Sequence, residues 1–393
     1  MSESIVIVSA ARTPMAGLMG DFASLSASQL GAVAIKAAIE RAGIPADAVE
    51  EVIMGNVLPA GQGQAPARQA ALGAGLALGA NCTTINKMCG SGMKAIMLAH
   101  DMLRAGNNSV MVAGGMESMS NAPYLMTKAR AGYRLGHGEL KDHMFLDGLE
   151  DAYDKGKLMG VFAEACADKY AFTREAQDEF ALRSLSRAQA AIADGKFKAE
   201  IAAVTVAGRK GDVLIDTDEQ PGKALPEKIP GLKPAFRKDG TVTAANASSI
   251  SDGAAALVLM READAKARGL QPLARIVGHA SHAQEPGWFT TAPVGAMQKL
   301  FAKTGWSADS VDLYEINEAF AVVTMAAMTE LKLPAEKVNV HGGATALGHP
   351  IGASGARIVA TLIYALKTHG KTRGVASLCI GGGEATALAI ELI

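Results

Sequence analysis

Two thiols and one imidazole stand in glycine-rich segments of this chain. Cys89 lies within Lys-Met-Cys-Gly-Ser-Gly at 87–92, His349 lies within Gly-His-Pro, and Cys379 comes two residues before a run of three glycines. Glycine lets the backbone turn sharply and brings its N–H groups close to a substrate. Few chemistries need two sulfurs and an imidazole in such settings, so these segments predict one reactive site.

Cys89 has the position of a nucleophile. The apolar pattern at 93–99 predicts a helix that begins just after it, and the positive end of a helix favours a thiolate over a thiol. The alternative is a buried cysteine that serves only as a small hydrophobic residue, which is the usual role of a free thiol. The glycine-rich setting favours the nucleophile.

The chain closely resembles the thiolase family along nearly its whole length. Besides the Cys89, His349 and Cys379 segments, the resemblance rests on motifs that follow the family's order at 10–14, 114–120, 246–248, 317–320 and 342–344. It implies an α/β fold, namely a duplicated five-layered α/β/α/β/α core with an inserted loop domain.

An internal repeat agrees with that duplication. A strand-like segment at 49–56 precedes the Cys89 turn, its helix and a second strand at 109–115. The same order recurs from 311–317 through the His349 loop and a helix from 354 to a strand at 374–382. Alternating strands and helices predict sheets covered on both faces.

Three units are expected along the chain, since 393 residues exceed the usual size of a single domain. The N-terminal unit covers 1–120 and is completed by 246–271, and the C-terminal unit covers 272–393. Between them, 121–245 is polar, rich in charge and irregular near its prolines. By the resemblance, this insertion covers the active site and binds coenzyme A.

The resemblance also implies roles for five residues. Cys89 accepts the acyl group, and His349 takes the proton from its thiol and later holds the thioester oxygen. Cys379 is the acid/base for the α-proton of the second acyl group. Asn317 holds a water that joins His349 in one oxyanion hole, and backbone N–H groups at Cys89 and Gly381 form the other.

Some of these residues could instead have purely structural roles. His349 alone could be a histidine that caps a loop, and Asn317, between a strand and a helix, could be an ordinary helix cap. The glycines from Gly381 invite comparison with a dinucleotide-binding fingerprint. They lack the G-x-G-x-x-G spacing and the following β-α-β unit, as does Gly61-Gln-Gly, so that interpretation is rejected.

Several further positions match those that contact coenzyme A or the acyl chain in thiolases, although core packing would account for each one alone. Leu158 stands where acetoacetyl-specific thiolases carry histidine, and His341 stands where asparagine is customary. The arginine that clamps the nucleotide in some relatives has no counterpart, and Lys223 is a candidate substitute. The expected contact residues are Leu149, Met159, Lys223, Phe236, Ala244, Ser248 and Ala319.

Composition excludes other classes of function. A net charge of −1 makes nucleic acid an improbable partner. The four cysteines show no C-x-x-C spacing, so we expect no metal. Apolar runs are too short to span a membrane, and the start of the chain is unlike a secretory signal, which favours the reducing cytoplasm.

The resemblance implies a reversible Claisen condensation of two acetyl-CoA molecules to acetoacetyl-CoA and CoA through an acetyl-cysteine. Coenzyme A and acyl-CoA are then substrates, with no permanently bound cofactor. Degradative thiolysis of longer 3-ketoacyl-CoA in β-oxidation is one alternative, and a non-catalytic acyl-CoA- or lipid-binding protein is another, which the retained reactive residues disfavour. We expect a homo-oligomer, a tetramer built as a dimer of dimers, with the dimer contact near an edge strand at 81–86.

Overall fold

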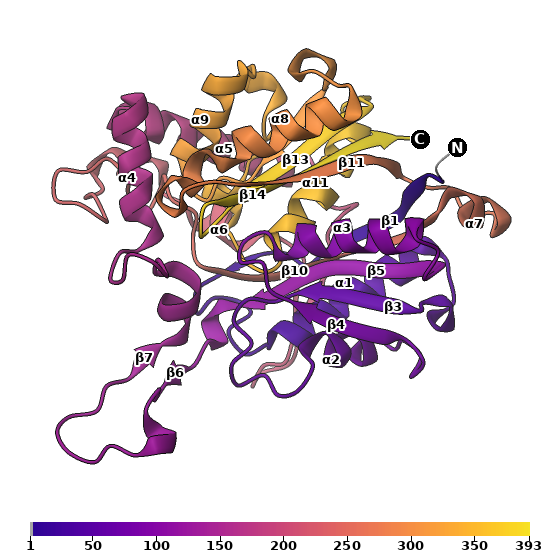
Figure 1. The fold of residues 1–393 in the computed structure, drawn as a ribbon, viewed down its shortest axis with the longest axis horizontal. Helices are drawn as coiled ribbons and strands as arrows, with labels where there is room; N and C mark the ends of the chain where they lie inside the picture. The colour runs from indigo at the N-terminus through magenta and orange to yellow at the C-terminus, as the bar shows by residue number, and fades with distance from the viewer. Residues whose placement is uncertain (1–2) are drawn as a thin grey trace.

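The computed structural model describes residues 3–393 and is built around one mixed sheet of ten strands (Figure 1). Parallel and antiparallel pairs both occur in this sheet. In spatial order its strands are β12 (Leu313–Ile316), β13 (Arg373–Ile380), β14 (Glu384–Leu392), β11 (Ala274–Ala283), β1 (Ile5–Arg12), β10 (Ser251–Arg261), β5 (Val110–Ser118), β3 (Glu51–Gly55) and β4 (Asn81–Ile85), and the short β2 (Ala16–Gly17) pairs with β10.

Helices cover both faces of each half of this sheet, which gives five layers (Figure 1). Three hydrophobic clusters fill the spaces between the layers, one below the N-terminal half, one between the halves and one above the C-terminal half. The covering helices are α1 (Ala27–Ala42) and α2 (Pro66–Gly73) on one outer face, α3 (Ser91–Arg104) and α11 (Ser354–Thr368) in the middle, and α8 (Ala292–Thr304) and α9 (Ala321–Leu331) on the other, with α7 (Glu262–Ala267) and α10 (Ala344–Leu347) as short helices in connections.

The two halves of the sheet repeat one topology. In the first half, β3 lies between β4 and β5, parallel to both, and β5 is followed by antiparallel β10 and β1. In the second, β12 is parallel to β13, which is followed by antiparallel β14 and β11. A single parallel bridge from Tyr314 to Val338 takes the place that β4 holds in the first half. The duplication expected from the sequence is therefore visible as matching strand order.

The halves join edge to edge where β1 pairs with β11. This pairing consists of two residue pairs, Val6 with Arg275 and Ile7 with Ala274. The five-layered core implied by the resemblance has two sheet layers, and the structure links their edges into one sheet. The reason is that β1 and β11 are the last strands of their halves, and each edge satisfies backbone groups that the other leaves unpaired.

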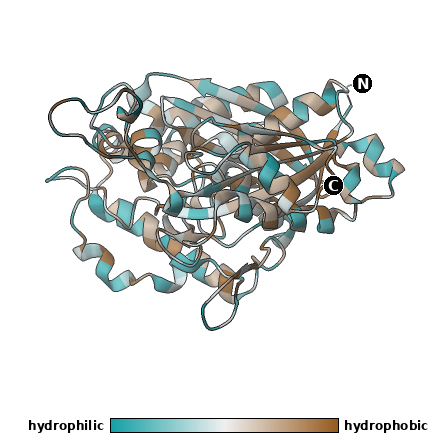
Figure 2. Ribbon diagram, turned by 90° about the horizontal axis from the view of Figure 1, so that it is seen from below, coloured by the Kyte–Doolittle hydropathy of each residue, from teal (hydrophilic) through white to brown (hydrophobic). Residues whose placement is uncertain are grey.

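Sequence features explain how the layers form. Helix α1 starts with a capping box in which Ser26 and Gln29 bond each other's backbone N–H, and it ends at Gly43 with φ 66°, a conformation that glycine adopts without strain. Helix α11 is buried from Ser354 to Leu366 on every side, as expected for a helix between two sheets. Figure 2 shows hydrophobic residues concentrated in the strands and hydrophilic ones on the outer helices.

The segment 121–245 adds helices and two hairpins beside the sheet. Its elements are β6 (Tyr124–Leu125), β7 (Lys141–Asp142), a π-helical turn (Phe145–Leu149), α4 (Met159–Tyr170), α5 (Arg174–Ala193), β8 (Val204–Val206), β9 (Val213–Ile215) and α6 (Glu219–Lys223). Buried Arg12 at the end of β1 anchors the segment, with Nε 2.5 Å from Glu200 and Nη1 2.7 Å from Asp218. The arm with β6 and β7 extends away from the sheet (Figure 1).

The α/β fold class expected from the sequence is confirmed, with its five layers and its duplication. The exact limits of the three units remain predictions. Across residues 3–393, no helix combines the length and the apolar character that crossing a bilayer would require.

Candidate active site

Four residues singled out from the sequence meet at one cavity of about 390 Å³. Cys89 comes from the turn before α3, His349 from the loop before α11, and Cys379 and Gly381 from the end of β13 and the turn after it. The two halves of the chain thus contribute to one site. The remaining wall is mainly apolar, and Asn317 lies behind it beside His349.

The turn that carries Cys89 is tight and held from both sides. Met88 has φ 46°, a left-handed conformation that costs energy for a residue other than glycine. The Ser91 hydroxyl accepts a bond from the Lys87 N–H at 2.8 Å and donates one to the Met88 carbonyl at 2.6 Å. A Cβ on Gly90 would lie 2.3 Å from Cδ1 of Ile380, so a larger residue there would have to displace that side chain. The turn fixes the sulfur at the start of α3.

The Cys89 thiol is protonated in the free protein. Burial raises its pKa to about 11, although the backbone N–H groups of Gly381 and of Cys89 itself oppose the rise. These are the two donors that the resemblance assigns to an oxyanion hole. They already face the sulfur, so an oxygen that develops beside it would meet the same pair.

His349 presents an unpaired nitrogen. Its Nδ1 lies 2.6 Å from the Ser354 hydroxyl and 3.4 Å from the Asn317 amide nitrogen, while Nε2 is buried and has no protein partner among residues 3–393. Burial, and then the charge of Arg357, lowers the pKa of His349 to about 3, so the ring is neutral. An unpaired ring nitrogen in a reactive cavity is suited to receive or donate a proton.

Ser354 allows either tautomer of this ring. Its hydroxyl also lies 2.9 Å from the Pro350 carbonyl. If the hydroxyl donates to that carbonyl, it accepts a bond from Nδ1–H and leaves a lone pair on Nε2. If it donates to Nδ1, the proton of the ring is on Nε2. Ser354 was not singled out from the sequence, where it reads only as the first residue of a helix.

Cys379 is buried beside Cys89. Burial, and then repulsion from the charge of Cys89, raises the pKa of its thiol well above the ordinary value. A thiol of this kind is a strong base once ionised. The pairing of the two cysteines matches the expectation from their glycine-rich segments.

Glu117, on β5, holds the loops around the cavity. One carboxylate oxygen accepts bonds from the Asn56 side chain and Leu58 N–H, and the other from Val57 N–H and Gly352 N–H, at 2.7–3.1 Å. Burial raises its pKa to about 7, although the N–H donors act against this. The sequence shows it as a carboxylate in an apolar strand, a signal that indicates a structural or functional constraint.

A second buried network supports Asn317. Arg357 lies 3.3 Å from the carboxylate of Glu315 and 3.5 Å from the Asn317 side-chain oxygen. Next in the chain, Glu318 accepts bonds from the Ser184 hydroxyl and from the N–H and hydroxyl of Thr345. The bonds from Thr345 tie this loop to the segment before His349. The Asn-Glu-Ala-Phe motif therefore fixes the site through its glutamate as well as its asparagine.

Most of the expected coenzyme A contacts line the same cavity, and Lys223 does not. It pairs with Glu219 at a second cavity of about 310 Å³, which shares Ala244 and Ser249 with the first. The expected residues that line the first cavity are Leu149, Met159, Phe236, Ala244, Ser248 and Ala319.

The two unusual residues have different surroundings. Leu158 lines the cavity at the start of α4. The presence of leucine in place of histidine therefore changes the wall of the cavity itself. His341 is buried elsewhere, with Nε2 3.2 Å from Nε2 of His369 and its ring 5.9 Å from that of Phe197. The presence of histidine in place of asparagine at position 341 therefore affects packing against His369 and Phe197, not the wall of the cavity.

Known proteins share this architecture and sequence. A family model described as thiolase, N-terminal domain, matches residues 5–263, and one described as thiolase, C-terminal domain, matches 270–392. Acetyl-CoA acetyltransferase 2 of Arabidopsis thaliana is 52% identical over 100% of this chain and 98% of its own, and acetyl-CoA acetyltransferase of Escherichia coli K12 is 52% identical over 99% of both.

Solved structures agree with these relatives. The acetyl-CoA acetyltransferase of Bacillus anthracis superposes with a TM-score of 0.97 at 44% identity, covering 100% of this chain and 99% of its own. The Acat5 thiolase of Ascaris suum, solved in complex with coenzyme A, superposes with a TM-score of 0.94 at 44% identity and covers 100% of both chains. With both halves matched and the reactive residues gathered at one cavity, this chain belongs to the thiolase family.

Proposed function

We propose that the protein is an acetyl-CoA C-acetyltransferase that condenses two acetyl-CoA molecules to acetoacetyl-CoA and CoA, and catalyses the reverse thiolysis. The observation that carries the proposal is the meeting of Cys89, His349, Cys379 and Gly381 at one largely apolar cavity. Full-length relatives with about half of their residues identical bear this name.

In the first step, Cys89 takes the acetyl group. Its proton moves to Nε2 of His349 as the sulfur attacks the thioester carbon, and the oxygen becomes an anion held by the N–H groups of Cys89 and Gly381. The bond to the sulfur of coenzyme A then breaks, and that sulfur takes the proton from His349. Because one thioester replaces another, the step is readily reversible.

In the second step, Cys379 as its thiolate removes the α-proton from a second acetyl-CoA. The resulting enolate oxygen is held by Nε2–H of His349 and by a water on Asn317. The carbanion attacks the acetyl carbon on Cys89, and the expelled Cys89 sulfur recovers a proton, which arrives through Cys379. A high thiol pKa suits this task, because the α-carbon is a weak acid.

We assign coenzyme A to the two adjoining cavities. The acyl and pantetheine parts lie along Met159, Phe236, Ser248 and Ala319, and Lys223 beside the second cavity meets a phosphate. The relative from Ascaris suum was solved with coenzyme A. The substrate is released after turnover, so no permanently bound cofactor is required.

The geometry favours short acyl chains over the long ones of a degradative thiolase. Met159 Sδ would lie 3.5 Å from a Cβ built on Gly381, so this side chain reaches the wall beside the reactive sulfurs. A longer tail would have to displace it.

We also propose a dimer of dimers that works in the cytoplasm. Strand β4 is half-exposed at the end of the sheet, and an edge strand of this kind suits a contact between copies. The arm formed by β6, β7 and their connection exposes four large hydrophobic side chains, which also suit such a contact. These side chains are Tyr124, Met126, Leu135 and Leu140. The cytoplasm is proposed because two catalytic thiols need a reducing compartment.

The assay follows loss of acetoacetyl-CoA when CoA is added to the purified protein. Turnover is expected, and peptide mass analysis after exposure to acetyl-CoA should place the acetyl group on Cys89. Cys89→Ser should lose turnover by several orders of magnitude, because an alkoxide is far harder to form than a thiolate. Binding of acyl-CoA with no turnover would replace the proposal by a non-catalytic binding protein.

A further inference from the structure

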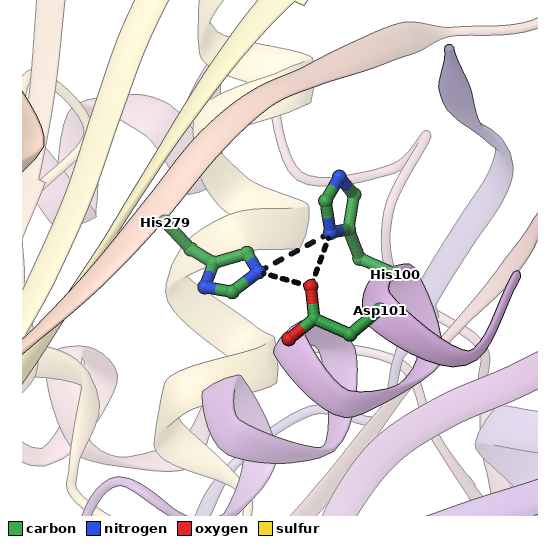
Figure 3. Close-up of side chains that lie close together, drawn as sticks. All are labelled: His100, Asp101 and His279. Atoms are coloured by element: carbon green, nitrogen blue, oxygen red, sulfur yellow. Dashed lines mark hydrogen bonds and ion pairs between the residues drawn. The ribbon is translucent and has the colours of Figure 1, made fainter. Parts of the chain in front are cut away.

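A compact group of metal-ligating side chains lies away from the cavity. His100 and Asp101 stand on α3, and His279 stands on β11, so the group joins the two halves of the chain (Figure 3). Both histidines are buried, while the Asp101 carboxylate is exposed. His100 lies nine residues after Ser91, about 14 Å along the helix from the Cys89 turn at 1.5 Å per residue.

The three donor atoms converge on one point (Figure 3). Nδ1 of His100 and Nε2 of His279 each lie 2.9 Å from the same oxygen of Asp101, and the two nitrogens are 3.2 Å apart. The centre of this triangle is about 1.7 Å from each atom, so an ion at the 2.0–2.1 Å of Zn–N bonds would sit about 1 Å outside its plane. That is the geometry of three ligands at one face of a tetrahedron.

We propose that His100, Asp101 and His279 bind a divalent transition-metal ion, with Zn²⁺ as the ion that fits best. Two imidazoles and one carboxylate form a ligand set that zinc accepts, with a fourth vertex left for water. The proposal goes beyond the acetyl-transfer activity and does not depend on it.

The charge around the group narrows the choice of ion. Lys94, Arg104 and Lys303 lie near the histidines, and Asp101 is the only carboxylate among the three ligands. Magnesium and calcium need several oxygen ligands, so they are disfavoured, whereas an ion that bonds strongly to imidazole nitrogen tolerates these neighbours.

The place of the group on α3 favours a cation. His100 and Asp101 lie near the C-terminal end of this helix, where the carbonyl ends carry partial negative charge. A bound ion would clamp α3, the helix that begins behind Cys89, to the C-terminal half.

Sequence patterns do not reveal this site, because its third ligand is 178 positions from the second. No metal was expected from the cysteine spacing, and neighbouring His100 and Asp101 do not form a metal motif by themselves. Folding alone brings His279 beside them.

The test titrates Zn²⁺ into metal-stripped full-length protein by calorimetry and uses the visible spectrum of Co²⁺ to report coordination. We expect about one ion per chain, a higher melting temperature with zinc, and its reversal by a chelator. Asp101→Asn changes an exposed side chain with little effect on packing, and it and His279→Gln should each weaken binding at least tenfold. His282→Gln on the same strand is the matched control and should bind as the parent does.

The reactive cysteines are a competing site, so the titration is repeated after Cys89 is alkylated with iodoacetamide. Unchanged affinity and stoichiometry would support the proposal. It would be overturned by absence of saturable binding, by loss of binding on alkylation, or by an equal loss in His282→Gln and Asp101→Asn.

Discussion

Glu117 of the N-terminal half accepts a hydrogen bond from the backbone N–H of Gly352 in the C-terminal half, at 2.8 Å. The same carboxylate holds the loop at 56–58, so one buried side chain joins the segments on both sides of the cavity. Gly352 stands three residues after His349 in the same loop, so the contact fixes the loop that carries His349, and we predict that turnover depends on it.

Glu117→Gln should lower both stability and turnover. In the parent, both carboxylate oxygens of Glu117 accept bonds from N–H groups. In the variant, the NH2 group of the amide replaces one of these oxygens and faces N–H groups that it cannot accept from. At least one buried donor is then unpaired, which costs about 1–3 kcal/mol. Urea unfolding and kcat for thiolysis measure the two effects. Glu391→Gln, in a partly exposed pair with Arg373, should change stability by less than about 0.5 kcal/mol. Normal stability in Glu117→Gln would refute this role.

Ser354→Ala should lower kcat by about 10- to 100-fold, with little change in KM. A loss of this size is a part of what general acid–base catalysis usually contributes to the rate. Without the hydroxyl, Nδ1 of His349 keeps only the more distant Asn317 as a side-chain partner. Steady-state kinetics with acetoacetyl-CoA and CoA measure the loss. Ser281→Ala on an exposed part of β11 is the control. An equal rise in KM and no fall in kcat would point to substrate binding instead.

Alkylation of Cys89 by iodoacetamide should accelerate steadily from pH 7 to pH 10. With the pKa of the thiol raised to about 11, the thiolate fraction rises about tenfold per pH unit over this range. Mass analysis locates the label. A rate that levels off below pH 8 would reveal a thiolate–imidazolium pair and contradict the neutral resting state.

Met159→Ala should improve use of a six-carbon 3-ketoacyl thioester relative to the four-carbon one. Room for two methylenes is worth about 0.8 kcal/mol each, or about tenfold together. The measurement is kcat/KM for thiolysis across chain lengths, and the parent enzyme should prefer four carbons. Leu158→His is the complementary variant and should narrow the range. A parent maximum at eight carbons or more would favour the degradative alternative.

His341→Asn should reduce the sensitivity of folding to acid. Burial, and then His369 and Lys196, lowers the pKa of His341 to about 4. Between about pH 4 and 6.5 the unfolded chain binds a proton that the folded one does not, so stability falls as the pH falls through this window. The loss from pH 7 to pH 5 is about 2 kcal/mol for this one group.

Denaturant unfolding at the two pH values measures this difference. His137→Asn, on an exposed loop, should keep the parent's loss. An identical loss in His341→Asn would assign the acid sensitivity to other groups.

The residues that meet at the cavity could be singled out because each stands in a local pattern. Glycines around Cys89 and the apolar run after it mark a turn into a helix, and α3 begins at Ser91 as that pattern requires. The strand predicted from Val49 begins at Glu51, since residues 46–48 form a short helical turn and Val49 and Glu50 lead out of it. Local periodicity fixes the type of an element better than its ends.

Contacts between distant segments were beyond the sequence. The pairing of β1 with β11 rests on two residue pairs, and the residue pattern of neither strand indicates which strand it pairs with. Ser354 was within a predicted helix, but its bond to His349 depends on how the loop folds back. The same holds for His279 beside His100.

The division of the active site between the two halves has a practical consequence. Cys89 belongs to the part before Arg268, while His349, Cys379 and Asn317 follow Pro272, and the connection between these parts is an exposed loop. A chain cut in this loop would carry the proposed nucleophile on one fragment and the proposed proton-transfer groups on the other. Regained thiolysis on mixing would then report reassembly, which makes the protein a candidate for a split-enzyme reporter.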